Sequence, residues 1–255
     1  MYGLQRKFWH VLGHWLLAAI VALVLLEGYF AARIALWSRI DPRSTTFQRS
    51  EIWRLSTQDQ HPLHWQQQWR DYGQISDNLK RAVITSEDDD FVNHDGVDWD
   101  ALEHAWEHNA KAEEQAEERA ARNRNHGKPP PVPRIRGGST ITQQLAKNLF
   151  LSGERTLLRK AQELALAYTL EALLSKRRIL ELYLNNVEWG EGIFGAEAAA
   201  QHYFHKSAAA LTAPEAARLA VMLPRPRYFE LRPASPYLVH RAAVIQGRMR
   251  SAELP

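Results

Sequence analysis

The chain has 255 residues, enough to bury a sizeable core and suited to one compact domain once a membrane segment is set aside. Its 32 Lys and Arg residues against 29 Asp and Glu give a net charge of +3, too small to argue for a nucleic acid partner. It lacks cysteine, which excludes disulfides and thiolate catalysis. His104 and His108 lie one helical turn apart and could bind a metal, but no third ligand has telling spacing, so we predict no metal ligands.

Residues 8–30 predict a single transmembrane anchor. No Asp, Glu, Lys or Arg occurs between Lys7 and Glu27, a stretch close to the roughly 20 apolar residues that a spanning helix needs. The alternative is a cleaved signal peptide, but no clear small-x-small cleavage site precedes the next charged residues. The positive charges of residues 1–7 place them in the cytoplasm, although arginines beyond the span weaken this bias.

Residues 31–74 mix polar residues with tryptophan and tyrosine without a sustained period. They predict an irregular, membrane-proximal connection to a domain at 75–255, and we expect no chemistry in them. Within that domain no strand alternation of any length occurs, whereas helical spacing and capping residues recur. The expected fold class is therefore mainly α.

The first informative stretch of the domain contains Glu87. Leu79 and Val83 recur on one face of a helix that Ser76 is placed to cap, and Glu87 falls on the same apolar face. Three aspartates at 88–90 follow directly. Burial and like charges both favour the protonated form of a carboxyl group, and this tunes a base towards neutral pH. The competing interpretation is a frayed helix end whose acids face water.

A helix capped by Asp98 runs into a segment rich in Ala, Glu, Lys and Arg and then into a proline run. We treat 111–133 as an insertion in the domain. The charged part predicts a solvated helical extension, and the prolines predict an extended loop.

Residues 137–148 open the next helix. Thr140 as N-cap with Gln143 three positions later has the pattern of a capping box. The glycines before it leave backbone amides open to an anion, and Lys147 lies one turn beyond Gln143, so a phosphate group could dock at this helix start. An ordinary capped helix after a glycine turn explains the same residues.

The helix at 159–171 is apolar nearly all round, so we expect it to cross the core. Glu163 shares a face with Leu166 and Leu170, one turn after Arg159. Either Glu163 forms an ion pair with Arg159 within the helix, or it is a second functional carboxylate. Ser175 caps the following helix, a glycine-punctuated loop comes next, and capping patterns predict further helices towards Arg248.

Together these stretches resemble the peptidoglycan glycosyltransferases, glycosyltransferase family 51. Four ordered motifs carry the likeness, which covers roughly residues 75 to 230: the Glu87 stretch, residues 137–148, Arg159-Lys160 with Glu163, and Arg178 to Asn185. The resemblance is to the monofunctional members, because the chain ends soon after this domain and contains neither Ser-x-x-Lys nor Lys-Thr-Gly. Two departures are the long insertion and Gly138, where relatives often carry alanine.

The resemblance implies a lysozyme-like helical glycosyltransferase domain behind one N-terminal transmembrane helix. The single-pass protein would lie in the bacterial inner membrane, with its catalytic domain in the periplasm. Its substrates would be lipid II, a disaccharide-pentapeptide on undecaprenyl pyrophosphate, and the growing glycan strand as donor. Other cell-wall synthesis proteins are expected as further partners. A divalent cation, Mg or Mn, on the pyrophosphate suits the family, although no motif here specifies one.

The resemblance also implies residue roles. Glu87 matches the general base that takes the proton from the acceptor 4-hydroxyl as it attacks the donor anomeric carbon, and Asp88 adjoins it. Glu163 matches a second acidic residue. Residues that match the donor wall and the pyrophosphate site are Ser139, Thr140, Gln143, Gln144, Lys147, Asn148, Arg159 and Lys160.

Two other functions fit parts of the pattern. A lysozyme-like hydrolase or lytic transglycosylase also uses a glutamate on glycan, but cuts the polymer instead of extending it. The cations around Lys147 and Arg159 argue against cleavage, since it has no pyrophosphate to neutralise. A membrane-tethered protein that binds peptidoglycan without turnover is the other alternative.

Overall fold

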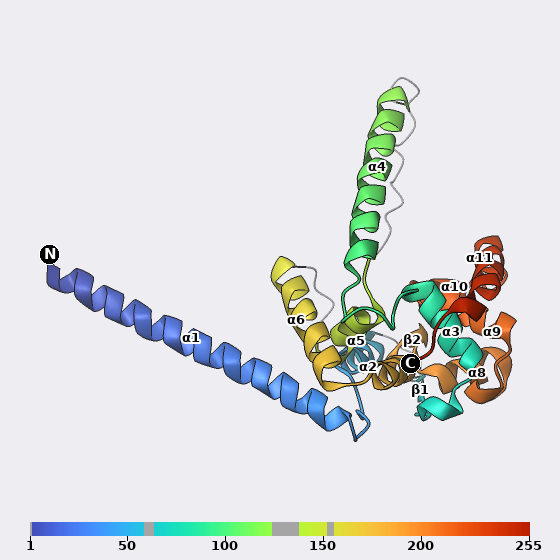
Figure 1. The fold of residues 1–255 in the computed structure, drawn as a ribbon, viewed down its shortest axis with the longest axis horizontal. Coiled ribbons are helices and arrows are strands. Elements are labelled where there is room, and N and C mark those ends of the chain that lie inside the picture. Colours follow the sequence, from blue (N-terminus) through green and yellow to red (C-terminus); the bar gives the residue numbers. More distant parts are fainter. Residues whose placement is uncertain (1, 59–63, 124–137, 152–155) are drawn as a thin grey trace.

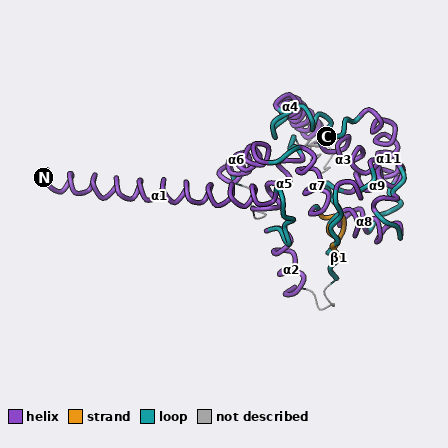
Figure 2. The backbone as a smooth tube through the Cα atoms, turned by 60° about the horizontal axis from the view of Figure 1, so that its bottom comes forward, coloured by secondary structure: helices purple, strands orange, loops and turns teal. Residues whose placement is uncertain are grey.

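The computed structural model describes residues 2–58, 64–123, 138–151 and 156–255. Most of them are helical, which confirms the prediction of a mainly α fold. One long helix, α1 (Tyr2–Trp37), extends away from a compact helical body in both views of the chain (Figure 1 and Figure 2).

The outer part of α1 is exposed and apolar. Residues Trp9–Trp37, with an 18-residue window of mean hydropathy 2.1, form the one helix in the described chain that is long and apolar enough to cross a membrane. The anchor predicted at 8–30 is part of this longer helix. Its last turns pack on the body, where Ile34 is fully buried and Trp37 stacks on Phe150 with ring centroids 5.1 Å apart.

Arg178 secures this end of α1. Its Nε donates to the Trp37 carbonyl (2.8 Å), and its Nη2 forms an ion pair with Asp41 (2.7 Å). The guanidinium group therefore satisfies a carbonyl at the end of α1 and also holds the chain that leaves it.

The prediction of an irregular connection over 31–74 is wrong. The segment contains the end of α1, helix α2 (Thr46–Gln58), strand β1 (Gln66–Gln67) and a 3₁₀ turn, η1 (Tyr72–Gln74). Gln48 is fully buried, accepts from the Thr45 amide (2.9 Å) and donates to Asn186 Oδ1 (3.4 Å). Because polar side chains form this contact between α2 and α7, the spacing of apolar residues did not predict that α2 packs on the body.

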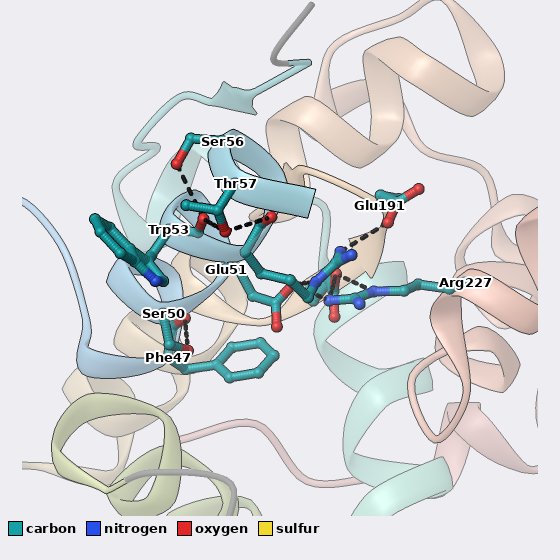
Figure 3. Close-up of polar contacts among 10 residues, drawn as sticks. Phe47, Ser50, Glu51, Trp53, Ser56, Thr57, Glu191 and Arg227 are labelled. Carbon is teal, nitrogen blue, oxygen red and sulfur yellow. Dashed lines mark hydrogen bonds and ion pairs between the residues drawn. The ribbon is translucent and has the colours of Figure 1, made fainter. Parts of the chain in front are cut away.

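Charged side chains also attach α2 to the body. Arg54 pairs with Glu51 (2.8 Å) on its own helix and with Glu191 (2.7 Å). Arg227 contacts both Glu51 and Glu188. Figure 3 labels Glu51, Glu191 and Arg227 of this network. The network links α2 to strand β2 (Glu188–Gly190) and to helix α10 (Pro226–Glu230).

The helices of the body pack in two groups. In one, α9 (Ala213–Met222) lies between α3 (Asp77–Glu87) and α11 (Pro236–Arg248). In the other, α5 (Ile141–Phe150) packs against α6 (Leu157–Leu173), α7 (Lys176–Asn186) and α2. The predicted N-caps are confirmed: side-chain oxygens of Ser76, Thr140 and Ser175 accept from the amides of Asn78, Gln143 and Arg178.

A small three-stranded sheet lies beside these helices. Strand β3 (Ile193–Phe194) pairs antiparallel with β2 and parallel with β1, and α8 (Ala196–Phe204) follows it. No strand was predicted, because segments of two or three residues carry no alternation. Gly192, at φ +70°, approaches His64 so closely that a Cβ would lie 2.0 Å from its carbonyl oxygen. Only glycine fits there.

Helix α4 (Trp99–Asn123) projects from the body as an arm (Figure 1). Its start is capped as predicted, with Asp98 Oδ1 accepting from the Ala101 amide (2.7 Å). The helix continues to Asn123, so the charged part of the 111–133 insertion is helical in its described residues. Its proline run lies outside the described residues.

Candidate active site

Glu87 ends α3 and is half-buried. Its Oε2 accepts a hydrogen bond from Gln144 Nε2 (3.0 Å), and its Oε1 accepts one from Ser86 Oγ (3.3 Å). Burial raises the pKa of Glu87, the two hydrogen bonds oppose that rise, and the charge of Asp88 adds a smaller increase. The carboxyl group therefore combines partial shielding from water with a raised pKa, as a general base at neutral pH requires.

Asp88 is held differently from Glu87. It is buried, its Oδ1 lies 2.8 Å from His94 Nε2, and its Oδ2 accepts from the backbone amide of Ile141 (2.9 Å). Both carboxylate oxygens are thus engaged by the protein. This arrangement favours a structural role for Asp88, joining the end of α3 to the start of α5, over the catalytic role that its position in the sequence suggested.

The side chains at the start of α5 form hydrogen bonds to the loop before α4 and to α6. Thr140 Oγ1 accepts from the Gln143 amide (3.2 Å) and donates to the Gly96 carbonyl (2.7 Å). Gln143 is buried, and its Oε1 accepts from Lys160 Nζ (3.4 Å) on α6. Adjacent glutamines of one helix therefore contact Glu87 on one side and a lysine on the other.

Helix α6 contributes a cluster of two cations and one carboxylate. Buried Glu163 forms an ion pair with Lys160, and Arg159 Nη2 lies 3.7 Å from Glu163 Oε2. The predicted pairing within the helix is therefore present. Arg159 Nη1 is also buried, and it has no hydrogen-bond partner within the ranges that the structure describes. A buried guanidinium nitrogen without a partner is costly, so it points to an anion that completes the site.

The other predicted substrate residues lie at the two ends of α5: Ser139 precedes its start, and Lys147 and Asn148 lie near its end. Ser139 and Lys147 are exposed and Asn148 is half-buried. A Cβ at Gly138 would lie 3.2 Å from Leu102 Cδ1, so glycine eases the approach of α4 to α5. Gly137, which the phosphate hypothesis also used, lies outside the described residues.

Tyr183 is a member of the site that sequence reasoning missed. Its side chain is fully buried on α7, and its hydroxyl donates to Gln144 Oε1 (2.9 Å). The helical spacing of Ile179, Leu180, Tyr183 and Leu184 predicts only an apolar core stripe. A tyrosine in such a stripe needs a polar partner for its hydroxyl, and that was the available signal.

Comparisons with known proteins identify the family of the chain. A family model described as Transglycosylase matches residues 56–250. The chain belongs to the transglycosylase family. It is 52% identical over 241 residues to a biosynthetic peptidoglycan transglycosylase of Paraburkholderia xenovorans, covering 94% of this chain and 92% of that protein. Proteins with the same description from Herminiimonas arsenicoxydans and Bordetella pertussis are 50% and 47% identical and cover 94% of this chain.

Helix α11 of this transglycosylase also brings positive charge towards Glu87, which the sequence did not reveal. The positive charge of Arg241, on α11, acts on Glu87 and lowers its pKa against the effect of burial. Two turns later on the same helix, Arg248 forms an ion pair with Asp89 (2.6 Å). Helix α11 is separated from Glu87 by about 150 residues of chain, so local patterns carry no signal for its approach.

Proposed function

We propose that this transglycosylase polymerises lipid II into glycan strands for the cell wall and releases undecaprenyl pyrophosphate. The observation that carries the proposal is the pair Gln143 and Gln144. Through them, one helix brings the half-buried carboxylate of Glu87 to one side and the cations of α6 to the other. A base for the acceptor and cations for a leaving pyrophosphate are the two needs of this reaction.

In the proposed step Glu87 acts as the general base. Its carboxylate accepts the proton of the acceptor 4-hydroxyl while that oxygen bonds to the anomeric carbon of the donor strand. The bond from the anomeric carbon to the pyrophosphate breaks at the same time, and the leaving group departs with the electron pair. Attack opposite the leaving group inverts the anomeric centre. The raised pKa of Glu87 makes it a stronger base than an exposed glutamate.

The cations of α5 and α6 are proposed to stabilise the departing pyrophosphate. Lys147 is exposed near the end of α5, and the buried Nη1 of Arg159 lacks a partner in the described chain. Lys160 and Arg159 are both restrained by Glu163. Fixed charges of this kind stabilise a developing negative charge without having to reorganise during the reaction. Glu163 is therefore proposed to orient the cations.

These residues do not fit a resident divalent cation. Asp88 is fully engaged by its neighbours, and Glu163 is paired with cations. Within the described residues no group of three or more His, Asp or Glu side chains is placed to hold a metal. We propose that an Mg or Mn ion, where it takes part, arrives with the pyrophosphate as part of the substrate.

The membrane placement completes the proposal. Helix α1 has the length and hydropathy to cross a membrane. The proposal is that it anchors the chain in the bacterial inner membrane, with residues 1–7 in the cytoplasm and the body in the periplasm. The lipid tail of the substrate would then lie in the same bilayer as the anchor. Other cell-wall synthesis proteins stay predicted partners.

The test is to incubate the purified full-length protein with lipid II and, separately, with finished peptidoglycan. We expect glycan polymer from lipid II and no soluble fragments from peptidoglycan. Fragments without polymer would identify a hydrolase or lytic transglycosylase. Binding to peptidoglycan without turnover of either substrate would identify a tethered binding protein.

A further inference from the structure

We infer that Tyr183 is a positioning residue for the reaction: through Gln144, its hydroxyl orients the amide that keeps the Glu87 carboxylate ionised. The inference rests on the proposed role of Glu87 as the base. It adds a residue that lies too deep in the core to contact substrate and that acts only through another side chain.

Three helices contribute one residue each to this chain of hydrogen bonds. Tyr183 of α7 donates to Gln144 Oε1 of α5 over 2.9 Å, and Gln144 Nε2 donates to Glu87 Oε2 of α3 over 3.0 Å. The Tyr183 ring is 0% exposed and Glu87 is half-buried. The series therefore runs from the core of the body to the site.

The direction of the series follows from the chemistry of its members. An ionised carboxylate accepts hydrogen bonds only, so Gln144 must present its NH₂ group to Glu87. The amide oxygen then points to the interior and needs a donor there, which the Tyr183 hydroxyl supplies. Burial, with smaller contributions from the charges of Glu87 and Asp88, raises the pKa of Tyr183 well above its ordinary value. The hydroxyl therefore stays protonated and remains a donor at every working pH.

Removing the hydroxyl should release Gln144. Its oxygen would face an apolar space, so the side chain would turn towards water and withdraw its NH₂ group from Glu87. Burial raises the pKa of Glu87, and without the hydrogen bond from Gln144 the pKa would rise further. A larger share of the Glu87 carboxyl groups would then be protonated and inactive at neutral pH. A merely structural loss would not produce this pattern, because it would lower activity equally at all pH values.

The experiment measures polymerisation of lipid II by full-length Tyr183→Phe from mildly acidic to alkaline pH, with thermal unfolding alongside. We expect activity at neutral pH to fall about 10-fold, the worth of one hydrogen bond to a charged group. We also expect the acid limb of the pH profile to move to higher pH, so that activity recovers in alkaline buffer. The matched control is Tyr203→Phe, which removes a hydroxyl that donates to the Trp189 carbonyl (2.9 Å) and should leave the profile unchanged.

A second pair of variants tests whether Tyr183 acts through Gln144. In a Gln144→Ala background, Tyr183→Phe should have little further effect on the pH profile, because the intermediary is gone. Separate effects that multiply in the double variant would overturn the inference. So would a fall in Tyr183→Phe that is equal at every pH. Normal polymerisation by Glu87→Gln would overturn the base assignment itself, and this outcome is independent of any result at Tyr183.

Discussion

The carboxylate of Asp88 accepts a hydrogen bond of 2.9 Å from the backbone amide of Ile141. This bond joins the last turn of the helix that ends at Glu87 to the first turn of the helix that carries Gln144. The contact between Glu87 and Gln144 therefore depends on a neighbouring pair that is buried and uses no atom of the base. Asp88 therefore helps to hold the ends of α3 and α5 in the arrangement that the site requires.

We expect Asp88→Ala to destabilise the protein by about 1–3 kcal/mol, the cost of leaving a buried donor without its acceptor. Asp88→Asn keeps an oxygen for the Ile141 amide and should unfold at nearly the wild-type temperature, with most polymerisation retained. Thermal unfolding and lipid II turnover measure the two effects. An Asp88→Asn protein that is stable but inactive would assign Asp88 to catalysis after all.

Glu87→Gln should lower polymerisation by about 100-fold to 10,000-fold, the usual contribution of a general base. Glutamine keeps the shape of the side chain but cannot accept a proton at neutral pH. Glycan-chain synthesis from lipid II is the measurement, with thermal unfolding as a control for folding. Near-normal synthesis would remove Glu87 from the mechanism and leave Glu163 as the candidate base.

The same variant has a predicted effect on the pH dependence of stability. The pKa of Glu87 in the folded protein is raised above its ordinary value of 4.5. The folded state therefore holds this proton more tightly, so the stabilisation by Glu87 is present below the unfolded pKa and is lost as the pH rises through the folded pKa. The thermal midpoint of Glu87→Gln relative to the wild type should increase from about pH 4 towards neutrality. A difference that is constant with pH would contradict the raised pKa.

Arg159→Ala and Lys147→Ala should each reduce turnover by about 100-fold, with a smaller effect on lipid II binding, since the charge they stabilise grows as the pyrophosphate leaves. Steady-state kinetics and thermal unfolding separate the two effects. Arg232→Ala, which removes an exposed cation stacked over Tyr228, is the matched control. Lower stability with normal turnover in Arg159→Ala would show that Arg159 serves only its ion pair with Glu163.

Removal of residues 113–132, with a short glycine linker between the ends, should leave most activity. Side chains at 113–115 of the α4 arm are exposed, so their loss uncovers little apolar surface. The thermal midpoint should change by less than about 2 °C. A drop of many degrees would show that the insertion packs against the body.

The sequence predicted those parts of the site whose causes are local. Ser76, Thr140 and Ser175 cap helices through bonds to amides two or three positions away, and the position of Glu87 on an apolar face follows from helical spacing. Such signals lie within one or two turns of chain. They located α3, α5 and α7 and the position of Glu87, whereas Gln144 was named only through the family resemblance.

The parts that the sequence did not predict depend on distant partners. Gln48 reaches Asn186 across 138 positions, and Tyr183 reaches Gln144 across 39. Burial of a polar side chain is predictable only when its partner is known, because the pair and not the residue satisfies the hydrogen bond. For the same reason, two-residue strands such as β1 have no pattern of their own until β3 is beside them.

If α1 spans the membrane as proposed, its docked end makes the bilayer part of the geometry in which the body meets its substrate. A helix of 36 residues is roughly 54 Å long, whereas the hydrocarbon layer is about 30 Å thick, so a membrane-spanning α1 must tilt or extend beyond it. Trp37 and Arg178 join the last turn to the body, so any tilt is passed on as a rotation of the whole body. Membrane thickness would then set the angle and height at which Glu87 meets a substrate whose tail is confined to that membrane, and vesicles with shorter or longer acyl chains would change the rate without altering a single residue.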